Sequence, residues 1–380
     1  MRSILFVLLS IAAASYAGEP AARFAPHPKL AGLAEKSALL ASEGYKGDGN
    51  VLDFSGIVYD PHRHRFYAFG GGHATRKFPN SVHEFDPATL QWSELSPDIS
   101  PKEYTRENAL FDAEKKPLGG LRYQGKIYAS SRHTYDGLVV PPNQSLMICT
   151  QLVGEIGGSY LDGTVYKECY KGSGLWTFDP VKREWSVSKK AGLAMNHVGS
   201  AVWPKEPDWI YFYAQTGTFR AVNWKTEEVR DLGKIPKGLP YSYAGLEYFP
   251  DEEALVALPR GPKETPQNKL FCKYDLKSGQ WTTVETQGEA PATHDCNAVY
   301  DPRNRVFVVF AEGDFFYFSP RDNRWYKTGS NAEALVGEKM IRHRHDYDPV
   351  NNVHLIVGRG WKTVAFKLSD TPGSLPGTAK

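Results

Sequence analysis

The chain has 380 residues, and its 45 Lys and Arg against 43 Asp and Glu give a formal net charge of only +2 at pH 7. A nearly neutral chain without a run of basic residues argues against nucleic acid as a partner. Aromatic residues make up 13% of the chain, and 35 Gly and 26 Pro provide turns. This composition favours many short strands over long helices.

The first 17 residues have the pattern of a signal peptide. Met1-Arg2 is basic, Ile4–Ala14 is apolar, and Ser15-Tyr16-Ala17 ends in small residues, which predicts cleavage after Ala17. The apolar run is too short to span a bilayer, and no other run approaches the roughly 20 residues that a spanning helix needs. We therefore expect a secreted or periplasmic protein without a membrane span.

Residues 18–49 are rich in Ala, Pro and Gly and contain one helical pattern, Leu30–Ser42. A helix is expected over this stretch. The segment as a whole is expected to wrap the domain that follows or to supply a strand that closes it.

A sequence unit recurs from residue 50 to residue 370. Each copy opens with an aromatic or apolar residue beside a turn, and a second and a third strand-like run follow. The openings are Tyr59-Asp60-Pro61, Val140-Pro141-Pro142, Trp203-Pro204, Tyr248-Phe249-Pro250-Asp251, Tyr300-Asp301-Pro302 and Tyr347-Asp348-Pro349. Four copies close with a tryptophan, at Trp92, Trp185, Trp281 and Trp325. Four short strands separated by turns make one blade, and blades that cannot bury their faces alone must pack together.

The repeat predicts an all-β fold, a single β-propeller over residues 50–370 with six or seven four-stranded blades. Six copies are clear, and residues 96–129 form either a long loop or a degenerate seventh blade. Residues 371–380 are expected to be a flexible tail.

Two features resemble kelch-type propellers. The first copy carries a run of glycines, Gly70-Gly71-Gly72, after its second strand, and several copies have a Tyr/Phe-Asp-Pro ending before the closing Trp, as in Phe85-Asp86-Pro87. The resemblance covers residues 50–370 and implies the fold, because propellers of this kind have unrelated functions.

Four cysteines in an exported chain make disulfides possible. Cys149 and Cys169 could staple the long insertion of the second blade, and Cys272 could pair with Cys296. His294 lies two residues before Cys296, so a structural metal is an alternative, although no CxxC or HExxH spacing supports it.

Polar residues of several copies are expected to meet at one mouth of the central channel. In each blade the first strand starts, and the second strand ends, at the same end of their hairpin. Most histidines of the chain fall at these positions. The candidates at the mouth are His73, Arg76, Asn80, His83, Arg132, His133, Tyr135, Asp136, His197, Tyr243, Arg260, His294, Asp295, Arg342, His343 and Asp346.

His, Tyr and Arg together suit proton abstraction next to a carboxylate. Arg neutralises the acid group of a uronate, while His or Tyr removes the α-proton and a second such group protonates the leaving oxygen. With Gly70-Gly71-Gly72-His73, His83, Tyr135 and the mouth arginines, the chain resembles the secreted propeller-type polysaccharide lyases, notably the ulvan lyases. The resemblance implies β-elimination on an acidic polysaccharide.

The candidate roles follow from this interpretation. His73 and Tyr135 are the leading base and acid, and His133 is the alternate base. The expected substrate-binding residues are Arg76, Asn80, His83, Arg132, His197, Tyr243, Arg260, His294 and Arg342. The neutralising arginine is open among Arg76, Arg132 and Arg260. No cofactor is required for this chemistry, and the protein is expected to act as a monomer.

The main alternative is a non-catalytic propeller that binds glycan or protein through the same mouth. A glycoside hydrolase would use two carboxylates, for which Asp136, Asp295 and Asp346 are available. A copper radical oxidase, also built on a kelch-like propeller, would need a Cys cross-linked to a Tyr, and no such pair is assigned here.

Overall fold

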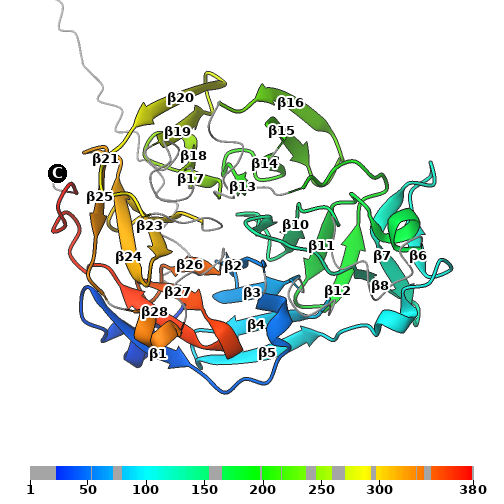
Figure 1. Ribbon diagram of the computed structural model, residues 1–380, viewed down its shortest axis with the longest axis horizontal. Coiled ribbons are helices and arrows are strands. Elements are labelled where there is room, and N and C mark those ends of the chain that lie inside the picture. The colour runs from blue at the N-terminus through cyan, green and yellow to red at the C-terminus, as the bar shows by residue number, and fades with distance from the viewer. Residues whose placement is uncertain are drawn as a thin grey trace, which may run out of the picture.

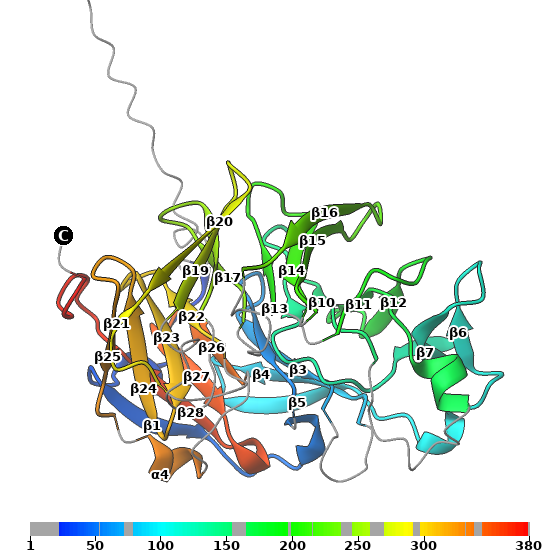
Figure 2. The same ribbon diagram turned by 45° about the horizontal axis from the view of Figure 1, so that its top comes forward.

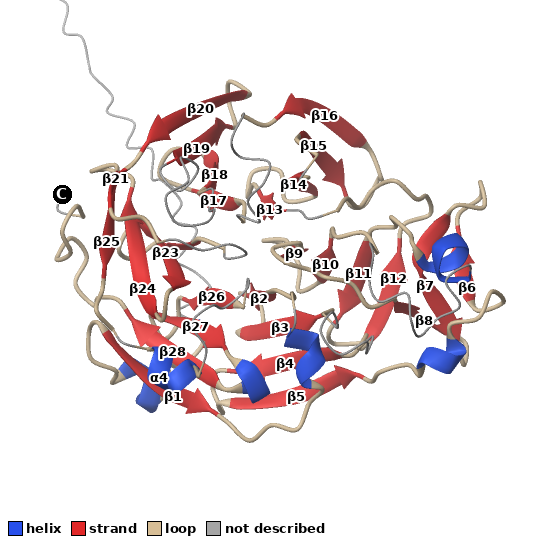
Figure 3. Ribbon diagram, in the orientation of Figure 1, coloured by secondary structure: helices blue, strands red, loops and turns tan. Residues whose placement is uncertain are grey.

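The computed structural model describes residues 23–52, 54–71, 79–153, 165–196, 199–214, 216–236, 245–258, 270–291, 297–330, 332–337 and 344–378. The predicted signal peptide lies outside these ranges. Strands dominate the described chain (Figure 3). Its helical segments are short: α2 (Pro28–Ala31), η1 (Gly49–Leu52), η2 (Pro101–Glu103), η3 (Tyr166–Tyr170), α4 (Glu333–Val336) and η5 (Arg359–Trp361).

Six sheets correspond to the six copies of the repeat and are called blades one to six. Blade one holds β2 (Ile57–Asp60), β3 (Arg65–Phe69), β4 (Val82–Asp86) and β5 (Gln91–Ser96), and blade two β9 (Leu138–Val139), β10 (Met147–Cys149), β11 (Trp176–Asp179) and β12 (Glu184–Val187). Blade three holds β13 (Gly199–Val202), β14 (Trp209–Tyr213), β15 (Thr218–Asn223) and β16 (Val229–Lys234), and blade four β17 (Glu247–Phe249), β18 (Ala254–Ala257), β19 (Leu270–Asp275) and β20 (Gln280–Glu285). Blade five holds β22 (Val299–Asp301), β23 (Val306–Ala311), β24 (Asp314–Ser319), β25 (Arg324–Lys327) and the parallel β21 (Gln287–Gly288), and blade six β26 (His345–Asp348), β27 (Val353–Val357), β28 (Thr363–Lys367) and β1 (Ser37–Ser42).

The first strands of the six blades form a closed ring. Strand β2 contacts β9, and the contacts continue through β13, β17, β22 and β26 back to β2 (Figure 1). The predicted single β-propeller is therefore confirmed.

A seventh sheet answers the question left open for residues 96–129. Strands β6 (Ala109–Phe111), β7 (Pro117–Tyr123) and β8 (Lys126–Ala129) form a three-stranded antiparallel sheet. It lies at the rim of the ring, beyond β12 (Figure 2). The indole N–H of Trp176 in β11 donates to the carbonyl oxygen of Leu118 in β7, 2.8 Å away, which ties this rim sheet to blade two.

The N-terminal segment supplies the outer strand of blade six. Strand β1 pairs antiparallel with β28, and the first and last parts of the chain thus share one sheet. The helix expected over Leu30–Ser42 is wrong: only α2 is helical, and Ser37–Ser42 is a strand. The exposed hydrogen-bonding edge of β28 needs a partner, and that tertiary requirement overrides the local helical preference.

The hydrophobic core is divided among the interfaces between neighbouring blades. Each interface joins aromatic and branched side chains from the facing sheets, as where Phe66 and Trp92 of blade one meet Val353 and Trp361 of blade six. Similar clusters lie between the other successive blades. The ring buries every blade on both faces, which explains why the repeats cannot fold singly.

The disulfide expected between Cys149 and Cys169 is wrong, because both are free, buried thiols. Cys149 belongs to the cluster between blades one and two, whereas Cys169 packs with Tyr104 and Tyr170 under the rim sheet. Two thiols in separate cores cannot approach to bonding distance. Cys272 is also free and buried. Its suggested partner Cys296, and the suggested metal ligand His294, lie outside the described residues.

The turns between first and second strands lie at the end opposite the mouth and link neighbouring blades. The carboxylate of Asp348 accepts the backbone N–H groups of Val350 and Asn351 and the side-chain amide of Asn351. Its Oδ1 also lies 3.0 Å from Nε2 of His64 in blade one. Two other turn carboxylates contact the next blade in the same way, Asp60 through Ser145 and Asp301 through His354.

Candidate functional site

Five of the twelve candidate site residues lie in the described part of the chain: Asn80, His83, Arg132, His133 and Tyr135. The other seven fall outside it: His73, Arg76, His197, Tyr243, Arg260, His294 and Arg342. The mouth can therefore be built from blades one and two.

The start of blade two lies against the end of the second strand of blade one. The N–H of Gly71 donates to the carbonyl oxygen of Arg132 at 2.7 Å. Gly70 has a φ of +96°, and a Cβ on this residue would stand 2.3 Å from that same oxygen. Only glycine allows this approach. The glycine-rich turn and the segment Arg132–Tyr135 thus share one end of the propeller.

His133 and Tyr135 form a hydrogen-bonded pair in this segment. Nδ1 of His133 lies 3.0 Å from the hydroxyl oxygen of Tyr135. The imidazole stacks on the ring of Phe54, with centroids 4.7 Å apart and planes at 24°, and the N–H of Tyr135 donates to the carbonyl oxygen of Phe54.

The backbone on both sides of this contact is held in the left-handed region. Tyr135 has a φ of 46° and Phe54 a φ of 58°. Left-handed φ values in bulky residues are rare and are found disproportionately at functional sites. His133 is half-buried and Tyr135 is only 4% exposed. Nε2 of His133 is itself buried.

Arg132 is directed inward. It is fully buried, and its guanidinium donates to the carbonyl oxygens of Ser130, Gln151 and Gly119. It also lies 5.7 Å from the ring of Trp176. The predicted role of Arg132 as a binder of substrate carboxylates does not fit this placement, because a guanidinium engaged by three backbone carbonyls joins the rim sheet to blade two. The sequence alone does not show which way this side chain turns.

His83 and Asn80 are also fully buried. Nδ1 of His83 lies 2.8 Å from the hydroxyl of Tyr45 and Nε2 lies 2.9 Å from the hydroxyl of Ser81. Burial lowers the pKa of His83 to about 4, so the ring is neutral near pH 7. The Asn80 amide donates to Ala129 and accepts from Ile99. Both residues hold the interior together, and the predicted contact with substrate does not fit this placement.

Three carboxylates project from the first strands of alternate blades or from just before them. Asp136, Glu247 and Asp346 are half-buried. Oδ2 of Asp346 accepts the N–H of Tyr59 in the adjacent blade at 2.7 Å, and Oδ2 of Asp136 accepts the N–H of Leu246 at 2.9 Å. The first bond joins the neighbouring blades six and one, and the second joins the non-adjacent blades two and four.

Burial raises the pKa of all three carboxyl groups, with that of Asp346 at about 7. The charge of Asp346 further raises the pKa values of Asp136 and Glu247. Sequence analysis did not find Glu247. The available signal was its position directly before an aromatic first-strand residue, Tyr248, which matches Asp346 before Tyr347.

The part of the chain that the structure describes contains no cluster of His, Cys, Asp or Glu arranged to hold a metal ion. Among the same residues, no helix is long and apolar enough to cross a membrane.

Comparisons with known proteins do not identify a family. No family model matches the chain, and no curated protein matches it. Among solved structures, one chain from a structure titled "Crystal Structure of Mitotic Checkpoint Complex" is 8% identical, with a TM-score of 0.45, over 88% of this chain and 92% of that one.

Proposed function

We propose that the protein is an exported lyase that cleaves a uronate-containing polysaccharide by β-elimination at the mouth of the propeller. The observation that supports this most is the pair formed by His133 and Tyr135, with 3.0 Å between Nδ1 and the hydroxyl oxygen. A phenol hydrogen-bonded to an imidazole can take one proton and deliver another.

The pair can balance the protons of the elimination. For this step Nε2 of His133, which is buried in the described chain, has to be uncovered when the polymer binds. It then takes the proton from the carbon next to the carboxylate, and the C–H electrons form a double bond as the glycosidic C–O bond breaks. The Nδ1 proton moves to the oxygen of Tyr135, whose own proton passes to the leaving oxygen. This scheme requires His133 to carry its proton on Nδ1 before the reaction.

Two further roles in the proposed reaction are assigned to residues predicted from the sequence. His73 remains an alternative base, and Arg76 or Arg260 would neutralise the substrate carboxylate, since Arg132 is engaged inside the fold. The polymer is proposed to lie across the mouth, where His133 is half-buried.

The test is incubation of purified protein with uronate polymers, followed by the ultraviolet absorbance of unsaturated products. Tyr135→Phe and His133→Ala should each lower the rate by roughly 10²–10⁴. His62→Gln is the matched control, because His62 is a half-buried histidine in the β2–β3 turn at the opposite end, and it should keep the full rate.

Two outcomes would overturn the proposal: no unsaturated product from any uronate polymer, or full activity in both mouth variants. If the protein binds such polymers without cleaving them, the non-catalytic glycan-binding propeller becomes the better description.

A further inference from the structure

A cleft separates the rim sheet from the outer edge of blade two. It has a volume of about 330 Å³ and lies between the β7–β8 hairpin and the β11–β12 turn. Its lining includes Arg122, Lys126, Tyr128, Arg183 and Trp185. The strands that contribute its lining, β7, β8 and β12, lie towards the outside of the ring, away from the first strands β2 and β13 (Figure 1). The cleft is therefore distinct from the mouth.

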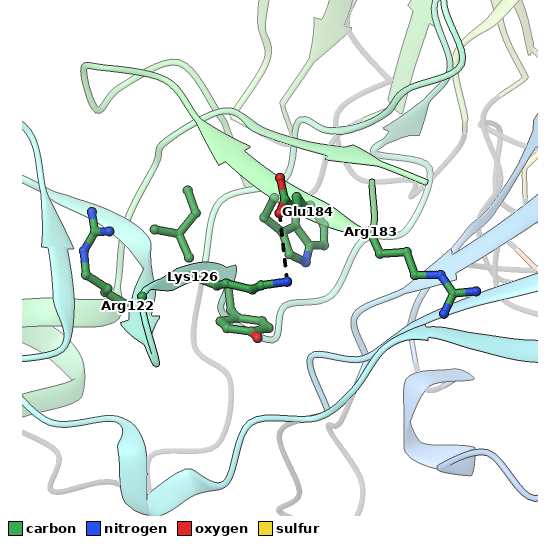
Figure 4. A pocket seen from close by; sticks show the side chains of 8 residues that line it. Arg122, Lys126, Arg183 and Glu184 are labelled. Atoms are coloured by element: carbon green, nitrogen blue, oxygen red, sulfur yellow. Dashed lines mark ion pairs between the residues drawn. The ribbon is translucent and has the colours of Figure 1, made fainter. Parts of the chain in front are cut away.

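Positive charge exceeds negative charge in this cleft. The lining contains three cationic residues, Arg122, Lys126 and Arg183, and one carboxylate, Glu184, whose Oε1 lies 3.9 Å from Nζ of Lys126. Neither arginine has an acidic partner within ion-pair distance in the described chain. Figure 4 shows the two arginines on either side of the Lys126–Glu184 pair. The two exposed guanidiniums lie on opposite sides of this pair, and this separation suits an extended anion better than a single small ion.

The walls between these charges are aromatic. Tyr128 is half-buried and Trp185 is 6% exposed. The indole N–H of Trp185 is buried and has no acceptor among the described residues. Trp281, at the same position of blade four, shares this feature, but Trp185 lines the cationic cleft. Tyr128 and Trp185 therefore supply the aromatic part of the cleft wall.

We propose that this cleft is a second binding site for an anionic glycan. Guanidinium groups bind carboxylate or sulfate oxygens in bidentate fashion, and aromatic rings contact the apolar faces of sugars. Nucleic acid is less favoured, because three cations do not form the long basic groove that a phosphate backbone requires. The inference builds on the proposed substrate class, but binding in the cleft needs no bond cleavage.

A second site would raise the affinity for long chains. A polymer held at the rim is present at high effective concentration at the mouth. Short oligomers that reach only the mouth would gain nothing from the cleft.

The experiment compares the unaltered protein with the double variant Arg122→Ala/Arg183→Ala in affinity electrophoresis. The probes are polygalacturonate, dextran sulfate, neutral dextran and a single-stranded oligonucleotide. The matched control is Arg321→Ala/Arg324→Ala, which removes two exposed arginines around the β24–β25 turn of blade five. Both double variants change the net charge equally.

The cleft variant should bind one or both anionic glycans at least about tenfold more weakly, which corresponds to one charge-assisted hydrogen bond or more. The control variant and neutral dextran should show no such difference. Loss with polygalacturonate identifies carboxylate recognition, and loss with dextran sulfate alone identifies sulfate recognition.

Equal loss in the control variant, unchanged binding in the cleft variant, or tighter cleft-dependent binding of the oligonucleotide would overturn the proposal. Competition by inorganic phosphate as strong as that of the polymers would also overturn it, since the site would then serve a small anion. Failure of the lyase proposal appears separately, as the absence of unsaturated product from the unaltered protein.

Discussion

The two ends of the propeller use polar residues differently. At the end that carries the β2–β3, β22–β23 and β26–β27 turns, Asp60, Asp301 and Asp348 each contact the next blade, and the pattern repeats around the ring. At the mouth, adjacent residues diverge: Arg132 is fully buried, while His133 is half-buried beside Tyr135. A contact repeated in several blades indicates a structural role, whereas the half-buried His133 with its partner Tyr135 is a better candidate for function.

The largest expected effect separates the two neighbours at the mouth. Arg132→Met should lower the free energy of unfolding by about 3–5 kcal/mol, because it leaves three buried carbonyl oxygens without a donor. His133→Ala should cost about 1 kcal/mol, since it removes one hydrogen bond and a ring contact. Urea denaturation of both variants measures the difference. Equal losses would contradict the division between an interior Arg132 and a site-forming His133.

At the opposite end, Asp348→Ala should cost about 2–4 kcal/mol, because three donors of its own turn and His64 lose a buried acceptor. Asp179→Ala is the control. Asp179 accepts from Val181 and Lys182 in an exposed turn, and its loss should cost about 1 kcal/mol. The urea midpoints of the two variants test whether contact between blades, beyond the turn itself, accounts for the larger cost.

The channel carboxylates should produce a pH dependence. Burial raises the pKa of Asp346 from 3.8 to about 7, so between these values the folded protein holds a proton that the unfolded chain has released. Stability from this group is therefore lost as the pH rises through that window. Asp346→Asn cannot ionise and should gain in melting temperature relative to the unaltered protein as the pH increases from 5 to about 8.

The melting temperatures of the variant and the unaltered protein must be compared at the same pH, because His83 changes the stability of both proteins with pH in the opposite direction. Its lowered pKa reduces stability as the pH falls from 6.5 towards 4, in both proteins alike. A constant difference in melting temperature between the Asp346→Asn variant and the unaltered protein from pH 5 to about 8 would show that Asp346 is already ionised in the folded state.

The smallest expected effect concerns the thiols. Because Cys149, Cys169 and Cys272 are free, a reducing agent should leave the melting temperature essentially unchanged. Alkylation of the denatured, unreduced protein, followed by peptide mass analysis, should label all three. Protection of Cys149 and Cys169 together would instead support the pairing considered from sequence.

Much of the fold could be predicted because the propeller repeats a local pattern. The run Arg65–Phe69 coincides with β3, and Val353–Val357 coincides with β27. The helix expected at Leu30–Ser42 failed because the open edge of β28, more than 300 residues away, decides the conformation of that segment.

The candidate site was harder to predict, because a sequence gives the end of a hairpin but not the direction of a side chain. Arg132 and His133 are neighbours in the same loop, and the sequence grouped them together. The carbonyls of Ser130, Gln151 and Gly119 draw the arginine inward, and Phe54 positions the imidazole at the mouth.

The sequence by itself determined the strand pattern, the turns and the six successive blades, since alternation and turn chemistry act between residues close in the chain. Only the tertiary structure decided the closing strand β1, the rim sheet beside blade two, the separation of Cys149 from Cys169 and the meeting of three carboxylates at the axis. Each of these depends on distant segments packing together, where burial and unsatisfied hydrogen-bonding groups outweigh local preference.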